Sequence, residues 1–313
     1  MTTVSVIIPS HNAAAYIAQT VASVLAQTMP DLELLLVDDG STDSTVAIVA
    51  ALGDARVRVM QQANGGVCKA RNRGIAEARS PFICLLDHDD WWLPNKLQRQ
   101  LEVLAQQPQA GVAYSSFERW YADPATGLFP PPEGFDFSAT PDDIDADFSG
   151  WVHHQFLLDC WMLTSTSMFR REVFARCGNF DESLPFSEDW DLWLRVARSF
   201  QFVQLRRPTT LYRMHASQGS GHHRPVDYRT RLLERTAAQY GLASRDGRAI
   251  TRQQFQHQLA RYQADFGRGE LHAGRVTSAL AAYAHAWRRH PTRWKYPAYL
   301  LATLGGWRGR EWS

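Results

Sequence analysis

The sequence has few cysteines and nothing that resembles an export signal. Its four cysteines, Cys68, Cys84, Cys160 and Cys177, lie far apart and form no CxxC pair. This spacing suggests neither a zinc ribbon nor a disulfide framework. Residues Met1-Thr2-Thr3 lead directly into an apolar strand, without the basic and long apolar segments of a signal peptide. We therefore expect a cytoplasmic protein.

The sequence also lacks an apolar run long enough to cross a bilayer. The longest late apolar stretch, residues 296–307, is interrupted by Pro297 and by Gly305-Gly306. It is much shorter than the roughly 20 residues that a membrane helix needs. Any membrane contact is therefore expected to be peripheral.

The chain has 313 residues, of which 45% are hydrophobic and 21% are charged, as in ordinary globular proteins. Its net charge of +1 hides an asymmetry between two parts. Residues 224–313 contain 16 Lys and Arg against 6 Asp and Glu, whereas residues 1–223 contain 17 against 26. We expect a main domain over 1–223 and a basic helical extension over 224–313. The extension either contacts an anionic partner or presents a dispersed, solvated helical surface; no nucleic-acid partner is expected.

Strands and helices alternate over the first 115 residues. Apolar, β-branched runs of strand length are each followed by a turn and an amphipathic helix. This alternation predicts an α/β fold with a mostly parallel central sheet flanked by helices. Asn12 is expected to cap the first helix, and Asp90 the helix beginning near Pro94. The expected strands are 4–8, 32–37, 57–60, 82–86 and 111–115.

The rest of the chain is less regular. Residues 120–159 have no sustained period and are expected to form a long loop region that contacts the acceptor. A strand is expected over 162–169, and helices over 171–176 and 188–200. The extension is predicted to form helices at 232–240, 253–266 and 273–289. The pair around Tyr262 and Tyr283 is faintly like a tetratricopeptide hairpin, but ordinary helix packing is the favoured interpretation.

The acids that follow residues 82–86 are the most informative local feature. An apolar run ends in Asp87-His88-Asp89-Asp90, with three carboxylates within four residues. In an open α/β sheet the ligand crevice lies beyond the carboxyl ends of the strands. On an extended backbone Asp87 and Asp89 point the same way and could share a divalent cation. The alternative is a solvated turn that caps the next helix.

Six segments in series make the sequence resemble the family 2 glycosyltransferases, which have a GT-A fold. Together they cover residues 4–220, and the chain after about residue 224 lies outside the resemblance. The segments are SVIIPSHN (5–12), VDDGSTDST (37–45), NGGVCKARNRGI (64–75), LLDHDDWW (85–92), SEDWDLWLR (187–195) and YRMHASQGS (212–220).

The resemblance implies a binding site for a nucleotide-sugar donor. Asp39 would accept from the imide N–H of a pyrimidine; its alternative role is to cap the Ser41 turn. His11 stands where relatives often carry an aromatic side chain that stacks on the base. Arg71 is the best cation for the diphosphate, because its planar fork matches phosphate oxygens. The other donor-binding residues that we expect are Pro9, Asn12, Asp38, Asn64, Gly65, Asp87 and His88.

The resemblance also implies a divalent metal, Mn²⁺ or Mg²⁺, that bridges the diphosphate. Asp89 is the expected ligand, and Asp87 reaches either the ribose or the metal. His215 fits a position where relatives supply a further ligand, although a lone histidine is often structural. An imidazole ligand would favour Mn²⁺ over Mg²⁺.

A second acidic cluster, Glu188, Asp189 and Asp191, begins the helix expected at 188–200. One acid there is explained by helix capping, but capping does not require three. Similar enzymes use the Asp of the Glu-Asp pair as general base towards an acceptor hydroxyl. We expect Asp189 to be the base, with Asp191 as the fallback, and single displacement to invert the anomeric carbon.

The resemblance implies transfer of one sugar from a UDP- or dTDP-sugar to a hydroxyl of a glycan or lipid-linked acceptor in cell-surface polysaccharide synthesis. The QxxRW motif of processive synthases is not matched at Gln218, which is followed by residues 219–222. The alternative is a catalytically inactive sugar-nucleotide-binding module that recruits a partner. A nucleotidyltransferase would need a glycine-rich loop after the first strand, and residues 9–12 contain no glycine. The basic extension is expected to dock on anionic membrane, where Trp287, Trp294 and Trp307 could lie.

Overall fold

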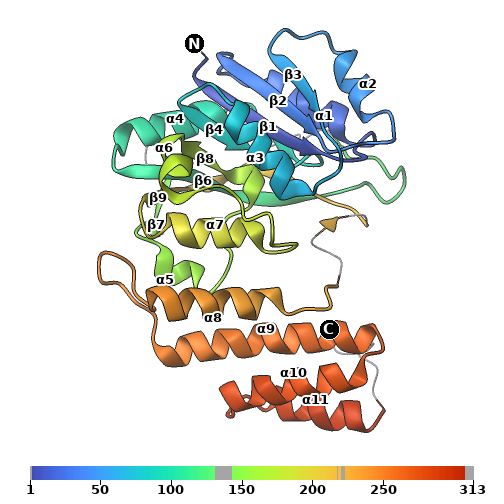
Figure 1. Cartoon of the computed structure of the whole chain (residues 1–313), viewed down its shortest axis with the longest axis vertical. Helices are drawn as coiled ribbons and strands as arrows, with labels where there is room; N and C mark the ends of the chain where they lie inside the picture. The colour runs from blue at the N-terminus through green and yellow to red at the C-terminus, as the bar shows by residue number, and fades with distance from the viewer. Residues whose placement is uncertain (1, 131–142, 217, 220–222, 307–313) are drawn as a thin grey trace. The chain divides into compact units, whose positions relative to one another are not determined.

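The computed structural model describes residues 2–130, 143–216, 218–219 and 223–306. Parts of our predictions that fall on 131–142, His222 or Trp307 lie outside these residues. The chain divides into two compact units (Figure 1). The first unit is Met1–Val152 with Cys160–Ala216, and the second is His153–Asp159 with Ser217–Ser313. The domain division after residue 223 stays a prediction.

A mixed sheet forms the centre of the first unit. Its order is β3-β2-β1-β4-β8-β6-β9-β5, and β7 pairs with β9. The first four strands of this order are parallel, as are β6 and β9, while β8 runs antiparallel between β4 and β6. The predicted helix-flanked, mostly parallel sheet is confirmed. The strands are β1 Val4–Ser10, β2 Leu32–Asp38, β3 Val57–Gln61, β4 Phe82–Leu85, β5 Trp91–Trp92, β6 Ala110–Tyr121, β7 Ile144–Gly150, β8 Met168–Arg170 and β9 Gln201–Met214.

Apolar runs explain why β1 and β2 lie at the centre of the sheet. Every residue of β1 is buried, which is typical of a strand covered on both faces. Helix α3 packs closely on β1, because a Cβ added at Gly74 would lie 2.3 Å from Cγ2 of Ile7. The helices of the first unit are α1 Ile17–Leu25, α2 Thr45–Ala50, α3 Val67–Glu77, α4 Lys96–Gln106, α6 Glu172–Cys177 and α7 Glu188–Val196.

Two of the expected helix caps are wrong. Helix α1 begins at Ile17, and Asn12 lies before it in the left-handed region at φ 48°. The Asn12 side chain instead accepts from the backbone N–H of Thr42, 2.9 Å away, and so holds the turn after β2. Asp90 is buried and bonds elsewhere, while α4 follows Asn95.

The region expected to be a long loop is partly sheet. Strand β6 extends to Tyr121, and β7 begins at Ile144, so regular pairing occupies both ends of the region. Strand β9, 14 residues long, was not predicted at all. Its Arg206-Arg207-Pro208 segment interrupts the alternation of apolar and polar residues that identifies a strand. The segment is nevertheless extended, because β9 pairs with β6 and β7. The strand expected at 162–169 is only β8, preceded by a short 3₁₀ turn at Thr164–Thr166.

The second unit is helical, and Figure 1 shows its main helices in orange to red. Helix α9 is longer than expected and begins with a capping box formed by Thr251 and Gln254. A close approach at Gly267, where a Cβ would lie 2.9 Å from the Tyr283 ring, brings α9 and α10 together. None of the described helices combines the length and apolar character needed to span a bilayer. The helices are α5 His153–Phe156, α8 Tyr228–Tyr240, α9 Arg252–His272, α10 Val276–Arg289 and α11 Lys295–Leu304. Neither α5 nor α11 was predicted.

Candidate functional site

Most of the predicted site residues of the first unit lie where neighbouring strands end. β1, β2 and β4 are parallel, so their carboxyl ends meet at one edge of the sheet. His11 follows β1, Asp39 follows β2, and Asp87 follows β4. Asp39 N–H donates to the carbonyl of Ser10 at 2.7 Å, and His88 Nδ1 lies 3.3 Å from the carbonyl of Pro9. One backbone hydrogen bond and one side-chain contact therefore connect the three strand ends.

The Asp39 carboxylate organises a glycine turn. It is buried and accepts from the backbone N–H groups of Gly65 and Gly66 at 2.9 and 2.7 Å. The side-chain amide of Gln62 donates to it at 2.8 Å. The Ser41 turn is instead held by Asp38, whose Oδ2 accepts from Ser41 N–H at 3.2 Å. Gln62 and Gly66 are contacts that sequence reasoning missed, although Gly66 lies inside a quoted segment.

His11 lies beside this turn with an exposed ring. Its Nδ1 is 3.0 Å from the carbonyl of Asp39, and the side-chain amide of Asn64 is 3.2 Å from the same nitrogen. Asn12 adds a further amide contact at 3.3 Å. The structure thus brings together the residues expected to bind the base, with a flat ring at the surface next to a buried carboxylate.

Arg71 connects the acidic loop after β4 with helix α7. Its side chain is buried, and it donates to Oδ1 of Asp87 and to Oε1 of Glu188, each at 2.8 Å. Burial alone would lower the pKa of Arg71, but the two carboxylates outweigh it and raise that pKa above its usual range. The Phe180 ring lies 5.1 Å from the guanidinium carbon. Because two carboxylates hold this guanidinium, its contact with phosphate stays a prediction.

Asp89 and His215 form the second pair at this edge. Nε2 of His215 lies 2.9 Å from Oδ2 of Asp89. Burial would raise the pKa of Asp89, but the hydrogen bond from His215 and the charges of His88 and His215 lower it. The ring of Tyr16 is tilted against the His215 ring, and the two ring centres lie 4.6 Å apart.

A carboxylate oxygen beside an imidazole nitrogen is a donor set that suits Mn²⁺. Asp89 and His215 therefore fit the metal that the resemblance implies. Asp87, the other expected ligand, is held by Arg71. Across the residues that the structure describes, no three His, Cys, Asp or Glu side chains are grouped as a metal centre.

Asp90 and Arg213 hold the acidic loop after β4 in place. Asp90 accepts from the Ser165 hydroxyl at 2.5 Å and from the backbone N–H of Arg213 at 3.2 Å. Burial, followed by the charges of Asp89 and Asp87, raises the pKa of Asp90 well above its usual range. Arg213 Nε donates to the Asp89 carbonyl at 2.5 Å. We did not predict a role for Arg213. The signal that could have indicated one is its position two residues before His215, in the segment YRMHASQGS.

The guanidinium of Arg213 is surrounded by aromatic rings. Its central carbon lies 4.3 to 4.9 Å from the ring centres of Trp120, Phe129 and Tyr16. Such faces stabilise a cation that has left water. The rings therefore fix the side chain that holds the Asp89 carbonyl.

Asp189 lies in the first turn of α7, after Ser187 at φ 60°. Burial and the adjacent Glu188 charge raise the pKa of Asp189 to about 7. Its Oδ1 accepts from the N–H of Trp190 at 2.7 Å. Asp191, the fallback base, is buried in an ion pair with Arg195 at 2.8 Å.

Two solved structures share the fold of this chain. One is the crystal structure of S. aureus TarS 1-349 in complex with UDP-GlcNAc. Its match covers 97% of this chain and 92% of the TarS chain, with a TM-score of 0.64 and 17% sequence identity. The other is mannosyltransferase PcManGT from Pyrobaculum calidifontis, in complex with GDP-Man and Mn²⁺. Its match covers 96% of this chain and 86% of the PcManGT chain, with a TM-score of 0.53 and 19% sequence identity. At these identities the likeness establishes the GT-A fold alone.

Sequence comparison gives the family. The model of glycosyl transferase family 2 matches residues 5–174. An uncharacterised glycosyltransferase of Rickettsia typhi is 31% identical over 202 residues, covering 62% of this chain and 58% of that protein. EpsJ, an uncharacterised glycosyltransferase of Bacillus subtilis, is 33% identical over 205 residues, covering 64% of this chain and 58% of EpsJ. The match spans less than two thirds of the length of either relative. The chain belongs to glycosyl transferase family 2.

Proposed function

We propose that this protein is an inverting, metal-dependent glycosyltransferase that moves one sugar from a nucleotide-sugar donor to an acceptor hydroxyl. The observation that carries the proposal is the link made by Arg71. One guanidinium holds Asp87, at the strand edge expected to bind the donor, and Glu188, next to the expected base. An ion pair of this kind fixes the distance between donor edge and base, which transfer requires.

The donor would lie along the edge formed by the ends of β1, β2 and β4. The exposed His11 ring offers a face for the base, and Asp39 and Asn64 supply polar contacts beside it. We propose a UDP- or dTDP-sugar. TarS in complex with UDP-GlcNAc supports a uridine donor, while PcManGT carries GDP-Man.

Asp89 and His215 would hold Mn²⁺ or Mg²⁺, with Asp87 beside them. When bound, the ion would supply charge that stabilises the departing nucleoside diphosphate. Arg213 fixes the backbone carbonyl of Asp89, and His215 orients its carboxylate. Arg213 and His215 therefore hold the backbone and the side chain of Asp89, the ligand that we propose.

Asp189 would take the proton from the acceptor hydroxyl. The oxygen then bonds to the anomeric carbon as the bond to the diphosphate oxygen breaks, so the configuration inverts. A pKa of about 7 for Asp189 suits a base at neutral pH, because the carboxylate is ionised for about half of the molecules and still basic. The Asp191–Arg195 ion pair favours Asp189 over Asp191 for this task.

The acceptor that we propose is a glycan or a lipid-linked saccharide in cell-surface polysaccharide synthesis. A chondroitin synthase of Pasteurella multocida is 27% identical over 207 residues, covering 65% of this chain and 20% of that protein. We further propose a cytoplasmic protein that docks on anionic membrane through its basic extension, residues 224–313. Recruitment to vesicles should rise with anionic lipid and fall with salt; equal binding to neutral vesicles would contradict the docking.

The experiment that tests this function is donor binding and turnover with a panel of sugar nucleotides. With Mn²⁺ or Mg²⁺, at least one donor should raise the melting temperature and be hydrolysed or transferred. Asp89→Ala should weaken binding of that donor. If no donor is turned over and Asp89→Ala binds donor unchanged, the proposal fails. Donor binding without turnover would favour the alternative of an inactive binding module.

A further inference from the structure

Helix α3 carries three basic side chains, Lys69, Arg71 and Arg73, and the protein itself engages two of them. Arg71 is held by two carboxylates. Arg73 donates to the carbonyl of Gln61 at 2.7 Å. Within the described part of the chain, the exposed ammonium of Lys69 has no hydrogen bond or ion pair. Lys69 is therefore the cation of this helix that remains available for a ligand.

The Lys69 side chain lies over the glycine turn that holds Asp39. A Cβ placed on Gly65 would lie 2.4 Å from Cδ and 3.3 Å from Nζ of Lys69. The lysine stem thus occupies the space that a side chain at position 65 would fill. Gly65 does not have a positive φ, so the close approach of Lys69 explains this glycine better than the backbone conformation does. Packing of the stem on the turn limits where the ammonium can go.

The residues around the same turn are those expected to contact the nucleotide base. Asp39 accepts from the backbone N–H of Gly65 at 2.9 Å. The side-chain amide of Asn64 lies 3.2 Å from Nδ1 of His11, whose ring is exposed. The ammonium of Lys69 therefore belongs to the base end of the expected donor site.

Asp39 and Lys69 do not neutralise each other. No ion pair joins these two described residues, because other donors already hold the carboxylate. A carboxylate has about four acceptor positions, and the N–H groups of Gly65 and Gly66 and the amide of Gln62 use three of them. One acceptor position and one separate cationic donor therefore remain at this turn.

The imide edge of uracil or thymine matches this pair. These bases present an N–H between two carbonyl oxygens, so the N–H can donate to Asp39 while a neighbouring carbonyl accepts from the Lys69 ammonium. Cytosine presents the reverse arrangement, with a lone pair on the ring nitrogen and an amino group beside it. It would place its lone pair against the carboxylate and its N–H groups against the ammonium, and both contacts are repulsive.

We propose that Lys69 determines base specificity, because its ammonium donates to the pyrimidine carbonyl beside the imide N–H that Asp39 accepts. The inference rests on the proposed function, since it requires a uridine or thymidine donor at this edge. A contact of Lys69 with phosphate would not depend on the base, so a comparison of two bases separates the two roles.

The experiment is calorimetry on the full chain with Mn²⁺, comparing UDP with CDP. These nucleotides differ only at the base edge that Asp39 and Lys69 would contact. The unchanged protein should bind UDP more tightly than CDP. Lys69→Met keeps most of the stem and removes the charge, so it should weaken UDP binding about five- to tenfold and leave CDP binding nearly unchanged.

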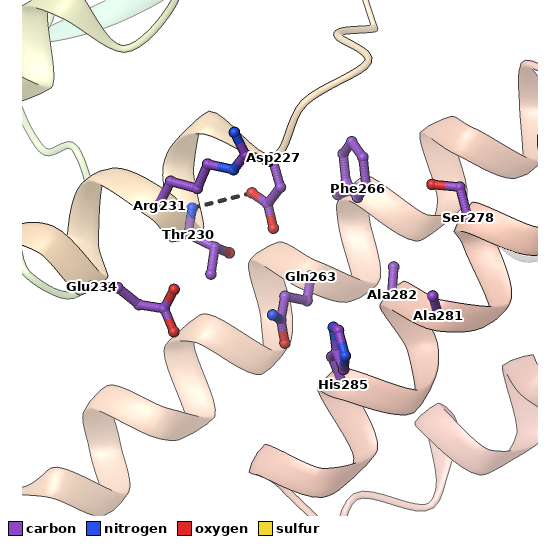
Figure 2. A pocket seen from close by; sticks show the side chains of 10 residues that line it. All are labelled: Asp227, Thr230, Arg231, Glu234, Gln263, Phe266, Ser278, Ala281, Ala282 and His285. Carbon is purple, nitrogen blue, oxygen red and sulfur yellow. Dashed lines mark hydrogen bonds between the residues drawn. The ribbon is translucent and has the colours of Figure 1, made fainter.

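The second unit supplies charge-matched controls. Lys295→Met and Arg231→Met each remove an exposed cation and should leave UDP binding unchanged. Figure 2 shows Arg231 on the wall of a cavity between α8, α9 and α10. These variants measure any effect of net charge alone on the binding of an anionic nucleotide.

The outcomes separate this inference from the proposed function. If Lys69→Met binds UDP as tightly as the two controls do, the role of Lys69 is overturned and the donor assignment stands. Equal losses for UDP and CDP would show a phosphate contact and would also overturn it, as would equal binding of UDP and CDP by the unchanged protein. If the unchanged protein binds no uridine or thymidine nucleotide, the donor assignment itself fails, and the role of Lys69 fails with it.

Discussion

Arg71 and Glu188 are 117 residues apart in sequence, and their side chains are joined by a hydrogen-bonded ion pair of 2.8 Å. The pair connects α3 with the start of α7. The other arm of the guanidinium holds Asp87, so three elements meet at one buried cation. Such a cation is costly to bury alone, and its partners are therefore required for stability as well as for position.

Arg71→Met should destabilise the protein. The substitution leaves Asp87 and Glu188 facing each other without their cation, and breaking a buried pair costs about 3–5 kcal/mol. Urea denaturation measures the loss in the free energy of unfolding. Arg73→Met is the matched control on the same helix, because Arg73 is only half-buried and should cost less than about 1 kcal/mol. Equal losses for both variants would contradict a structural role of the Arg71 network.

The rate of transfer should fall below about pH 7. The base must be ionised, and burial with the Glu188 charge raises the pKa of Asp189 to about 7. At lower pH the ionised fraction, and with it the rate, should fall about tenfold per pH unit. A pH profile of kcat/KM measures this limb. A rate that stays constant down to pH 5 would exclude Asp189 as the base.

Asp189→Asn should raise the melting temperature at neutral to alkaline pH. The folded-state pKa of Asp189, about 7, lies above its unfolded value, so the stability of the unchanged protein falls as pH rises from about 4 through 7. Asparagine does not titrate, and the gain of the variant should be absent near pH 4 and complete above pH 7. Thermal unfolding across this range measures the difference. A gain that does not change with pH would contradict the raised pKa.

His215→Ala should weaken binding of the metal more than it weakens binding of the nucleotide base of the donor. The pair of Asp89 and His215 fits a shared cation, and loss of one contact should raise the metal concentration needed for half-maximal donor binding about tenfold or more. A Mn²⁺ titration followed by thermal shift measures this change. His223→Ala is a matched histidine control in the second unit and should leave the titration unchanged. Unchanged metal dependence in His215→Ala would leave His215 a structural residue.

Gly74→Ala should cost about 1–3 kcal/mol by overpacking α3 against β1. The added Cβ would lie 2.3 Å from Cγ2 of Ile7. Ile7→Ala removes that atom, so the double variant should lose less than the sum of the two single losses. Strict additivity in urea denaturation would show that the two residues do not compete for this space.

The first half of the fold was predictable because its signals are local. The apolar runs of β1, β2 and β4, and the acids that follow them, are visible in short windows, and parallel strands bring their ends to one edge. Strand β9 was missed because its conformation depends on partners far away in the sequence, at β6 and β7.

The individual site contacts were harder to predict for the same reason. Asp89 lies beside His215 as an expected ligand pair would. The partners of Arg71, by contrast, depend on packing between segments 117 residues apart. Asp90 looked like a local cap, but burial against Ser165 and Arg213 outweighs capping. Residue types at strand ends thus indicate chemistry, while pairing across the fold decides which acid is free to act.

The most direct measurement compares transfer by the unchanged protein and by Asp189→Asn, with the active sugar nucleotide and Mn²⁺ or Mg²⁺. The variant should retain donor binding, because Asp189 lies on α7 and is not among the residues that hold the Asp39 or Asp89 carboxylates. Its kcat should fall about 10²- to 10⁴-fold, the usual contribution of a general base. Full activity in Asp189→Asn, with donor bound, would contradict the proposed mechanism.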